Sequence, residues 1–122
     1  MLSLLVAALL ALPVGAQTAV KDSGDIVVLR LSARSEKHVR EGHFAGGRNS
    51  RGKSLFIAGA DLPALLKVAQ KSKPRRESNG RDKRVSDAGK MIGTDGRTGR
   101  LVRTYVVIAE PDGTVVTMYP GR

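Results

Sequence analysis

Two histidines, His38 and His43, are the residues of this chain best suited to proton transfer, because the ordinary pKa of imidazole lies near neutrality. Cutting RNA without a metal needs a base for the ribose 2′-hydroxyl, an acid for the leaving 5′-oxygen and a cation for the developing phosphate charge. Lys53, Arg48 and Arg51 follow closely and could supply that cation. The residue types therefore fit metal-free RNA cleavage. The structural alternative is a helix-surface His38 and a loop His43, and isolated histidines are often of this kind.

A metal site is the competing interpretation of the histidine pair. His38 and His43 are five residues apart, which on a continuous helix separates them by about 140°, and Glu41 is the only nearby carboxylate that could join them. The chain has no cysteine, which excludes a Cys-based zinc finger, an iron–sulfur site, a disulfide scaffold and a thiol nucleophile. We therefore expect neither a metal nor another cofactor.

The composition favours a polyanionic partner. The 122 residues are enough for one domain and carry 21 Lys and Arg against 11 Asp and Glu, a formal charge of +10. Such a balance is typical of proteins that bind nucleic acid, acidic membranes or acidic proteins. A hydrophobic content of 41% argues against a disordered basic tail. With two Phe, two Tyr and no Trp, aromatic stacking cannot dominate, so we expect binding mainly through phosphates and a strong dependence on salt.

The first 20 residues differ from the rest because they contain no charged residue. An apolar run over residues 2–12, broken by Pro13 and Gly15 and followed by small residues before Gln17, is typical of a signal peptide. We expect residues 1–16 to be a signal peptide and residues 17–122 to form a single secreted basic domain. An apolar N-terminal helix, or the remnant of a longer parent protein, is the alternative. The run is too short to span a bilayer comfortably, so no stable membrane insertion is expected.

Two helices are predicted in the first half of the basic domain. Residues 26–31 read as a short strand or extended lead-in, and residues 35–41 as a helix capped by Ser35 and stopped by Gly42. The glycine- and arginine-rich residues 42–52 should form a loop. A second helix should begin at its N-cap Asp61, with Pro63 in the first turn. Its apolar face is expected to comprise Leu62, Leu65, Leu66 and Ala69.

The second half of the domain predicts β-structure. Residues 72–84 carry mostly basic side chains and should form a mobile solvated loop, or else a phosphate-tracking arm. Strands are expected over residues 85–92, 101–109 and 114–119, with a turn at 110–113. Pairing Ala109 with Thr114 would place Val106 opposite Thr117 and Thr104 opposite Tyr119, with Val115, Thr117 and Tyr119 on one face. The predicted fold is α+β: short N-terminal helices packed on a small antiparallel β-sheet that ends in a C-terminal hairpin.

Several short motifs occur in an order that resembles one ribonuclease family. They are His38-Val39-x-x-Gly42-His43, Gly46-Gly47, Gly52-Lys53-Ser54-x-Phe56, an amphipathic helix, and Gly113-x-Val115-Val116-Thr117-x-Tyr119-Pro120. Together they cover residues 36–120 and look like the bacterial EndoU-type ribonuclease domain, often the C-terminal toxin of contact-dependent and other polymorphic toxin systems. That family is similar to the group of small α+β ribonucleases that includes barnase, RelE and the tRNA-cleaving colicins.

The resemblance implies roles for particular residues. His38 matches the first catalytic histidine, as base or acid, and Lys53 the lysine that stabilises the phosphate. Thr117 and Tyr119 match strand residues that contact the scissile phosphate and the base. The family's second histidine follows the Gly-Gly pair, where this chain has Arg48. Either His43 takes that role, or Arg48 replaces an acid by a fixed cation, which can neutralise phosphate but cannot transfer a proton near pH 7.

The resemblance therefore implies a metal-independent endoribonuclease toxin that cuts single-stranded RNA or tRNA and leaves a 2′,3′-cyclic phosphate. We expect a secreted monomer that acts in the cytoplasm of a target cell and is blocked by an acidic cognate immunity protein. Its expected substrate-binding cations are Arg48, Arg51, Arg75 and Arg76. The alternative is a non-catalytic basic module that binds nucleic acid. A membrane-active antimicrobial protein is a weaker alternative, because residues 62–71 are too short for the cationic helix it would need.

Overall fold

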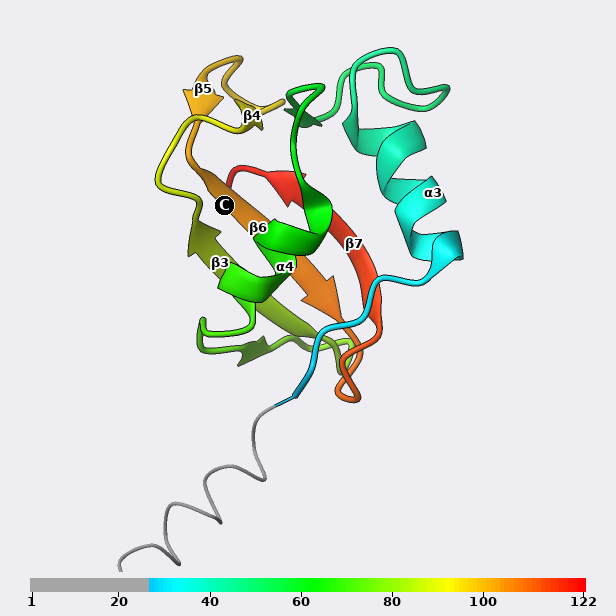
Figure 1. Cartoon of the computed structure of the whole chain (residues 1–122), viewed down its shortest axis with the longest axis vertical. Helices are drawn as coiled ribbons and strands as arrows, with labels where there is room; N and C mark the ends of the chain where they lie inside the picture. Colours follow the sequence, from blue (N-terminus) through cyan, green and yellow to red (C-terminus); the bar gives the residue numbers. More distant parts are fainter. Residues whose placement is uncertain (1–26) are drawn as a thin grey trace, which may run out of the picture.

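The computed structural model describes residues 27–122, so the predicted signal peptide at 1–16 lies outside the described residues. The described part contains two helices and two antiparallel sheets, which confirms the predicted α+β class with a hairpin near the C-terminus (Figure 1). The elements are α3 (Ala33–His43), β1 (Leu55–Phe56), α4 (Leu62–Ala69), β2 (Arg75–Arg76), β3 (Asp82–Asp87), β4 (Gly93–Thr94), β5 (Leu101–Val102), β6 (Thr104–Ala109) and β7 (Val115–Pro120).

The larger sheet has the strand order β2-β3-β6-β7, and the smaller one β1-β4-β5. Helix α4 covers one face of the larger sheet, while α3 lies beside the edge strand β7 (Figure 1). The core fills the space between the sheet and α4, where the buried Tyr105 hydroxyl donates a hydrogen bond of 2.5 Å to the Leu65 carbonyl. The site described below lies on the opposite face of the sheet.

The prediction for α4 is confirmed in detail. Asp61 is the N-cap, and its carboxylate accepts a hydrogen bond of 3.1 Å from the amide of Ala64, as expected for an aspartate before a first turn that contains proline. The residues of the helix that are buried are Leu62, Leu65, Leu66 and Ala69. Four apolar side chains at helical spacing therefore suffice to attach α4 to the sheet.

The predicted boundaries of the first helix are wrong at both ends. Ser32, not Ser35, is the N-cap of α3, and its hydroxyl accepts a hydrogen bond from the Ser35 amide. Ser35 instead donates from its own hydroxyl to the Val115 carbonyl at 2.5 Å, which ties the helix to β7. Gly42 does not stop the helix: it is buried, and α3 continues to His43. The helix therefore includes both Gly42 and His43.

The basic segment 72–84 is not one mobile loop. It contains β2 and the start of β3, which form an antiparallel hairpin with Arg75 opposite Lys83. Arg84 is only 3% exposed, so it occupies a strand position that faces the core. A charged residue does not predict such a position. The predicted strand 85–92 is therefore displaced to β3, and the predicted strand 101–109 is interrupted at Arg103 between β5 and β6.

The C-terminal hairpin forms as predicted, but the predicted register of its two strands is wrong. The turn at 110–113 is present, with Gly113 at φ 96°, a conformation that favours glycine. A β-bulge after Ile108 leaves Val116 unpaired, so that Val106 lies opposite Tyr119 and Ile108 opposite Thr117. Thr117 and Tyr119 still share a face, but Val115 is turned into the core instead of lying beside them.

Candidate active site

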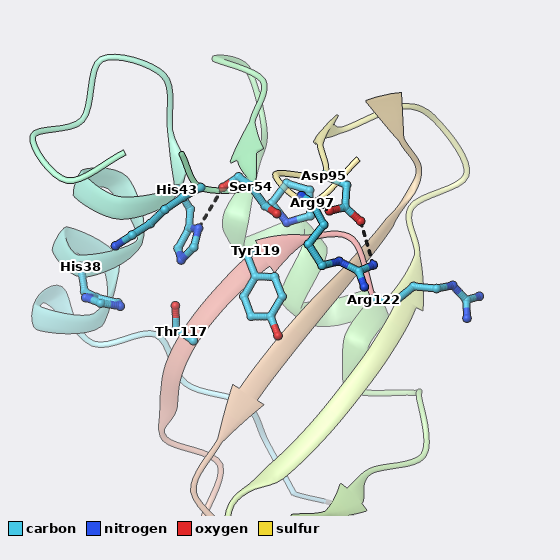
Figure 2. A pocket seen from close by; sticks show the side chains of 10 residues that line it. His38, His43, Ser54, Asp95, Arg97, Thr117, Tyr119 and Arg122 are labelled. Atoms are coloured by element: carbon cyan, nitrogen blue, oxygen red, sulfur yellow. Dashed lines mark hydrogen bonds and ion pairs between the residues drawn. The ribbon is translucent and has the colours of Figure 1, made fainter. Parts of the chain in front are cut away.

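A cleft of about 370 Å³ opens where α3, the start of β1, the turn after β4 and the end of β7 meet (Figure 2). It brings together five residues that the sequence singled out: His38, His43, Lys53, Thr117 and Tyr119. Its other lining residues are Ser54, Asp95, Arg97, Pro120 and Arg122. The cleft therefore combines two imidazoles, three cationic side chains, three hydroxyl groups and one carboxylate.

The His43 ring is held in one orientation. Its Nδ1 lies 2.9 Å from the Ser54 carbonyl oxygen, and because a carbonyl can only accept, Nδ1 carries the proton and donates it. The ring lies 5.5 Å from the Tyr119 ring, centroid to centroid. The remaining nitrogen, Nε2, is therefore the one available for proton transfer, as in sites where a backbone carbonyl fixes the tautomer.

The surroundings of His43 favour its neutral form. Burial lowers the pKa of His43, since a charged imidazolium loses hydration there, and the positive charges of Lys53 and His38 lower it further. The hydrogen bond to the Ser54 carbonyl opposes this shift but does not cancel it. At neutral pH His43 is thus an unprotonated imidazole with a free Nε2 lone pair, which is the state a general base requires.

The lowered pKa of His43 predicts the acid limb of the pH–rate profile. If this cleft cleaves RNA with neutral His43 as the base, kcat/KM for RNA cleavage should fall only below the ordinary imidazole pKa of about 6.5. NMR titration of the His43 ring should show a midpoint at the same pH as this limb. A His43 midpoint above 6.5, or an acid limb that does not coincide with it, would contradict the role of His43 as base.

The two histidines face the same cleft despite their spacing. Their ring centroids are 6.4 Å apart and the rings are nearly perpendicular. The expected separation of 140° does not prevent this, because His43 is the last residue of α3 and lies at the corner where the chain leaves the helix. His38 is exposed on the last full turn before it. Both imidazoles line the same cleft (Figure 2).

A second hollow of about 400 Å³ continues from His38 and Lys53 and is lined by Arg48 and Arg51. Gly47 makes it possible, because a Cβ at this position would lie 2.5 Å from the Arg40 carbonyl oxygen and could not be accommodated. The glycine loop therefore folds back on the end of α3. It places Arg48 in the adjoining hollow beside His38, whereas His43 lines the central cleft with His38.

Thr117 and Tyr119 contribute two hydroxyl groups from β7. The Thr117 Oγ1 atom is buried and has no hydrogen-bond partner within residues 27–122, and Figure 2 shows it directed toward the histidines. Buried hydroxyl groups are almost always satisfied, so a missing partner at the edge of the cleft singles out the Thr117 hydroxyl. Burial raises the pKa of Tyr119, so its hydroxyl keeps its proton.

Sequence reasoning missed a cation in the cleft, Arg97. The buried carboxylate of Asp95 accepts from the Arg97 amide at 2.8 Å and from its guanidinium at 3.1 Å, and these hydrogen bonds lower the pKa of Asp95. Gly96 donates to the Ser54 hydroxyl at 2.8 Å, which fixes the turn beside His43. The signal was the Asp-Gly-Arg-Thr-Gly sequence at 95–99, since aspartate followed by glycine is typical of a turn closed by its own side chain. Ser54 and Arg122 were also missed.

The structure separates the neighbouring arginines Arg75 and Arg76. Arg76 forms an ion pair of 2.6 Å with Asp82 and lines none of the hollows described here. Arg75 lines a third hollow of about 300 Å³ that shares Arg122 with the central cleft. Of these two predicted substrate-binding residues, only Arg75 therefore lines a hollow that shares a residue with the central cleft.

No protein-family model matches the chain, and no curated protein shows a significant match. Over residues 27–122, no three His, Asp or Glu side chains form a group that could hold a metal ion. Neither α3 nor α4 is long and apolar enough to cross a membrane.

Proposed function

We propose that this protein is a metal-independent endoribonuclease of the EndoU-like kind, acting as a toxin on single-stranded RNA or tRNA. One observation carries the proposal: two imidazoles face one cleft with their centroids 6.4 Å apart, and the Thr117 hydroxyl, which has no partner among residues 27–122, is directed toward them. Acid–base cleavage needs a base and an acid within hydrogen-bond reach of different oxygens on the same phosphorus. The order of motifs along the chain supports the same function.

His43 is the base in this proposal, and His38 is the acid. Nε2 of His43 takes the proton of the ribose 2′-hydroxyl while the 2′-oxygen forms a bond to phosphorus. The bond from phosphorus to the 5′-oxygen breaks, and protonated His38 gives its proton to that oxygen. The products are a 2′,3′-cyclic phosphate and a free 5′-hydroxyl. Proton exchange with water then restores both histidines.

Cations around the cleft stabilise the charge that develops on the phosphate. The side chain of Lys53 reaches the end of α3, where its Nζ lies 3.8 Å from the position that a Cβ on Gly42 would occupy. Lys53 lines both the cleft and the adjoining hollow. Arg97, another cation that lines the cleft, is held in place by its ion pair with Asp95. Donors that are fixed before the reaction stabilise a transition state more effectively than donors that must reorganise. The Thr117 hydroxyl would add a neutral donor between them.

The cationic rim also suits the partner expected of a toxin. An acidic immunity protein would cover the cleft by charge complementarity and block access of RNA. The net charge of +10 would speed its association and make binding sensitive to salt.

Incubation of the purified protein with tRNA in EDTA tests the function. We expect cleavage to persist in the chelator and to disappear in the His38→Ala variant. A matched variant, Lys90→Gln, removes an exposed charge outside the cleft and should cleave at the rate of the unmodified protein. RNA binding without any product would support the basic binding module instead, and cleavage abolished by EDTA would indicate a metal-dependent nuclease.

A further inference from the structure

One row of outward-facing residues crosses the larger sheet from the cleft to its far edge. Arg75 on β2 pairs with Lys83, Lys83 with Ile108, and Ile108 with Thr117 on β7. Directly paired residues in an antiparallel sheet share a face, so Arg75 and Lys83 lie on the side of the catalytic cleft. Three strand spacings of about 4.8 Å separate the ends of this row.

A second row runs beside the first and is apolar. Val85 pairs with Val106, and Val106 pairs with Tyr119. Val85 remains 38% exposed, so this row ends in an apolar surface that solvent can reach. The two cations of the first row, Arg75 and Lys83, thus lie next to the apolar row on the same face.

The hollow at the end of these rows has the same dual character. Four cations, Lys73, Arg75, Lys83 and Arg122, surround Val85 in a space of about 300 Å³. Among residues 27–122, the ion pairs involve none of these four side chains. Arg122 also lines the central cleft and projects away from the two histidines (Figure 2), so its side chain borders both the hollow and the cleft.

We propose that this surface, from Tyr119 across β6 and β3 to Arg75, is a binding track for nucleotides of a single-stranded RNA outside the scissile phosphate. The track rests on the proposed function, because it extends from the cleft where the cut would be made. Lys73, Arg75, Lys83 and Arg122 bind phosphates, and a base lies on Val85.

The paired rows favour a single strand over a duplex. A duplex presents phosphates outward and keeps its bases stacked inside, so an exposed apolar residue between cations would have no partner. A single strand exposes bases and phosphates together and can use both rows. The side chains that line the hollow around Val85 include four cations and no carboxylate side chain.

Binding of 2′-O-methyl oligonucleotides tests the track without cleavage, because they lack the attacking hydroxyl. The variant is Arg75→Gln with Lys83→Gln, and its control is Lys67→Gln with Lys90→Gln, which removes the same charge on the α4 side of the sheet. We expect the track variant to bind a hexanucleotide about tenfold more weakly, with a salt slope smaller by about 1.4 for two lost phosphate contacts. A dinucleotide should bind both variants equally.

Three results would overturn the track: an unchanged hexanucleotide affinity in the track variant, an equal loss in the control variant, or tighter binding of duplex than of single-stranded RNA. Competition by a poly-glutamate peptide as effective as the oligonucleotide would also overturn it, in favour of an acidic protein partner. If the unmodified protein fails to cut an all-RNA hexanucleotide while the track variant still loses affinity, the track stands and the proposed cleavage fails.

Discussion

Replacing His43 by Asn should reduce kcat for RNA cleavage by about 10²–10⁴, the usual contribution of a general base. The asparagine amide can still donate to the Ser54 carbonyl that now accepts from Nδ1 at 2.9 Å, so the local hydrogen bond is kept while the lone pair on Nε2 is lost. Lys53 and Arg97 remain in the cleft, so KM should change little. Single-turnover kinetics with a short RNA would separate the two constants.

Two controls make the result for His43→Asn specific. Thermal unfolding should match that of the unmodified protein, because the ring is only partly buried. Affinity for a 2′-O-methyl oligonucleotide should also be retained. A loss of kcat below tenfold would remove His43 from the mechanism, and a loss that appears only in KM would make it a binding residue.

Phe56→Ala should lower the free energy of unfolding by about 3–5 kcal/mol, the usual cost of deleting a buried aromatic ring. Phe56 is 1% exposed, and its ring lies 5.6 Å from that of Phe44, centroid to centroid. Phe44 follows His43 directly, and Phe56 lies two residues after Ser54. The pair therefore joins the end of α3 to β1, and its loss should also loosen the hydrogen bond that orients His43.

Chemical denaturation measures this cost, and Leu101→Ala is the matched control. Leu101 is a large apolar residue on a strand of the same small sheet but is 61% exposed, so its replacement should change the unfolding free energy by less than about 0.5 kcal/mol. Equal effects of the two substitutions would show that the Phe44–Phe56 contact does not support the cleft.

The parts of the fold that the sequence could predict are those with local signals. An Asp-Leu-Pro start and four apolar residues at helical spacing defined α4, and the Glu-Pro-Asp-Gly sequence defined the last turn. Strand β2 and the first half of β3 were missed because their residues are mostly charged, and Arg84 faces the core where an apolar residue would be expected. Pairing of β3 with β6 stabilises such a strand, and pairing partners distant in sequence give no local signal.

The register of the hairpin shows another limit. Alternation of side chains predicts a face for each residue only if no residue is inserted. The bulge at Val116 breaks this assumption and moves Val115 to the core. It leaves Thr117 and Tyr119 together, so the predicted pair of site residues still shares a face although the pairing used to reach it was wrong.

The sequence could predict five residues that line the cleft, namely His38, His43, Lys53, Thr117 and Tyr119, but not the groups that position them. The Ser54 carbonyl and Asp95 act through the backbone and a turn, and nothing in their types distinguishes them from other polar loop residues. Arg97 was one of 21 basic residues. Arg97 reaches the cleft only because its turn contacts the residue before β1, through the hydrogen bond that Gly96 donates to Ser54.

A DNA oligonucleotide that contains one ribonucleotide tests the central claim most directly. If His43 activates a 2′-hydroxyl, the protein should cut this strand in EDTA only on the 3′ side of the ribonucleotide, and mass spectrometry should find a 2′,3′-cyclic phosphate on the upstream product. Cleavage at deoxyribonucleotides would contradict the claim, because they carry no 2′-hydroxyl. A ribonucleotide left uncut under conditions in which the strand is bound would contradict it equally.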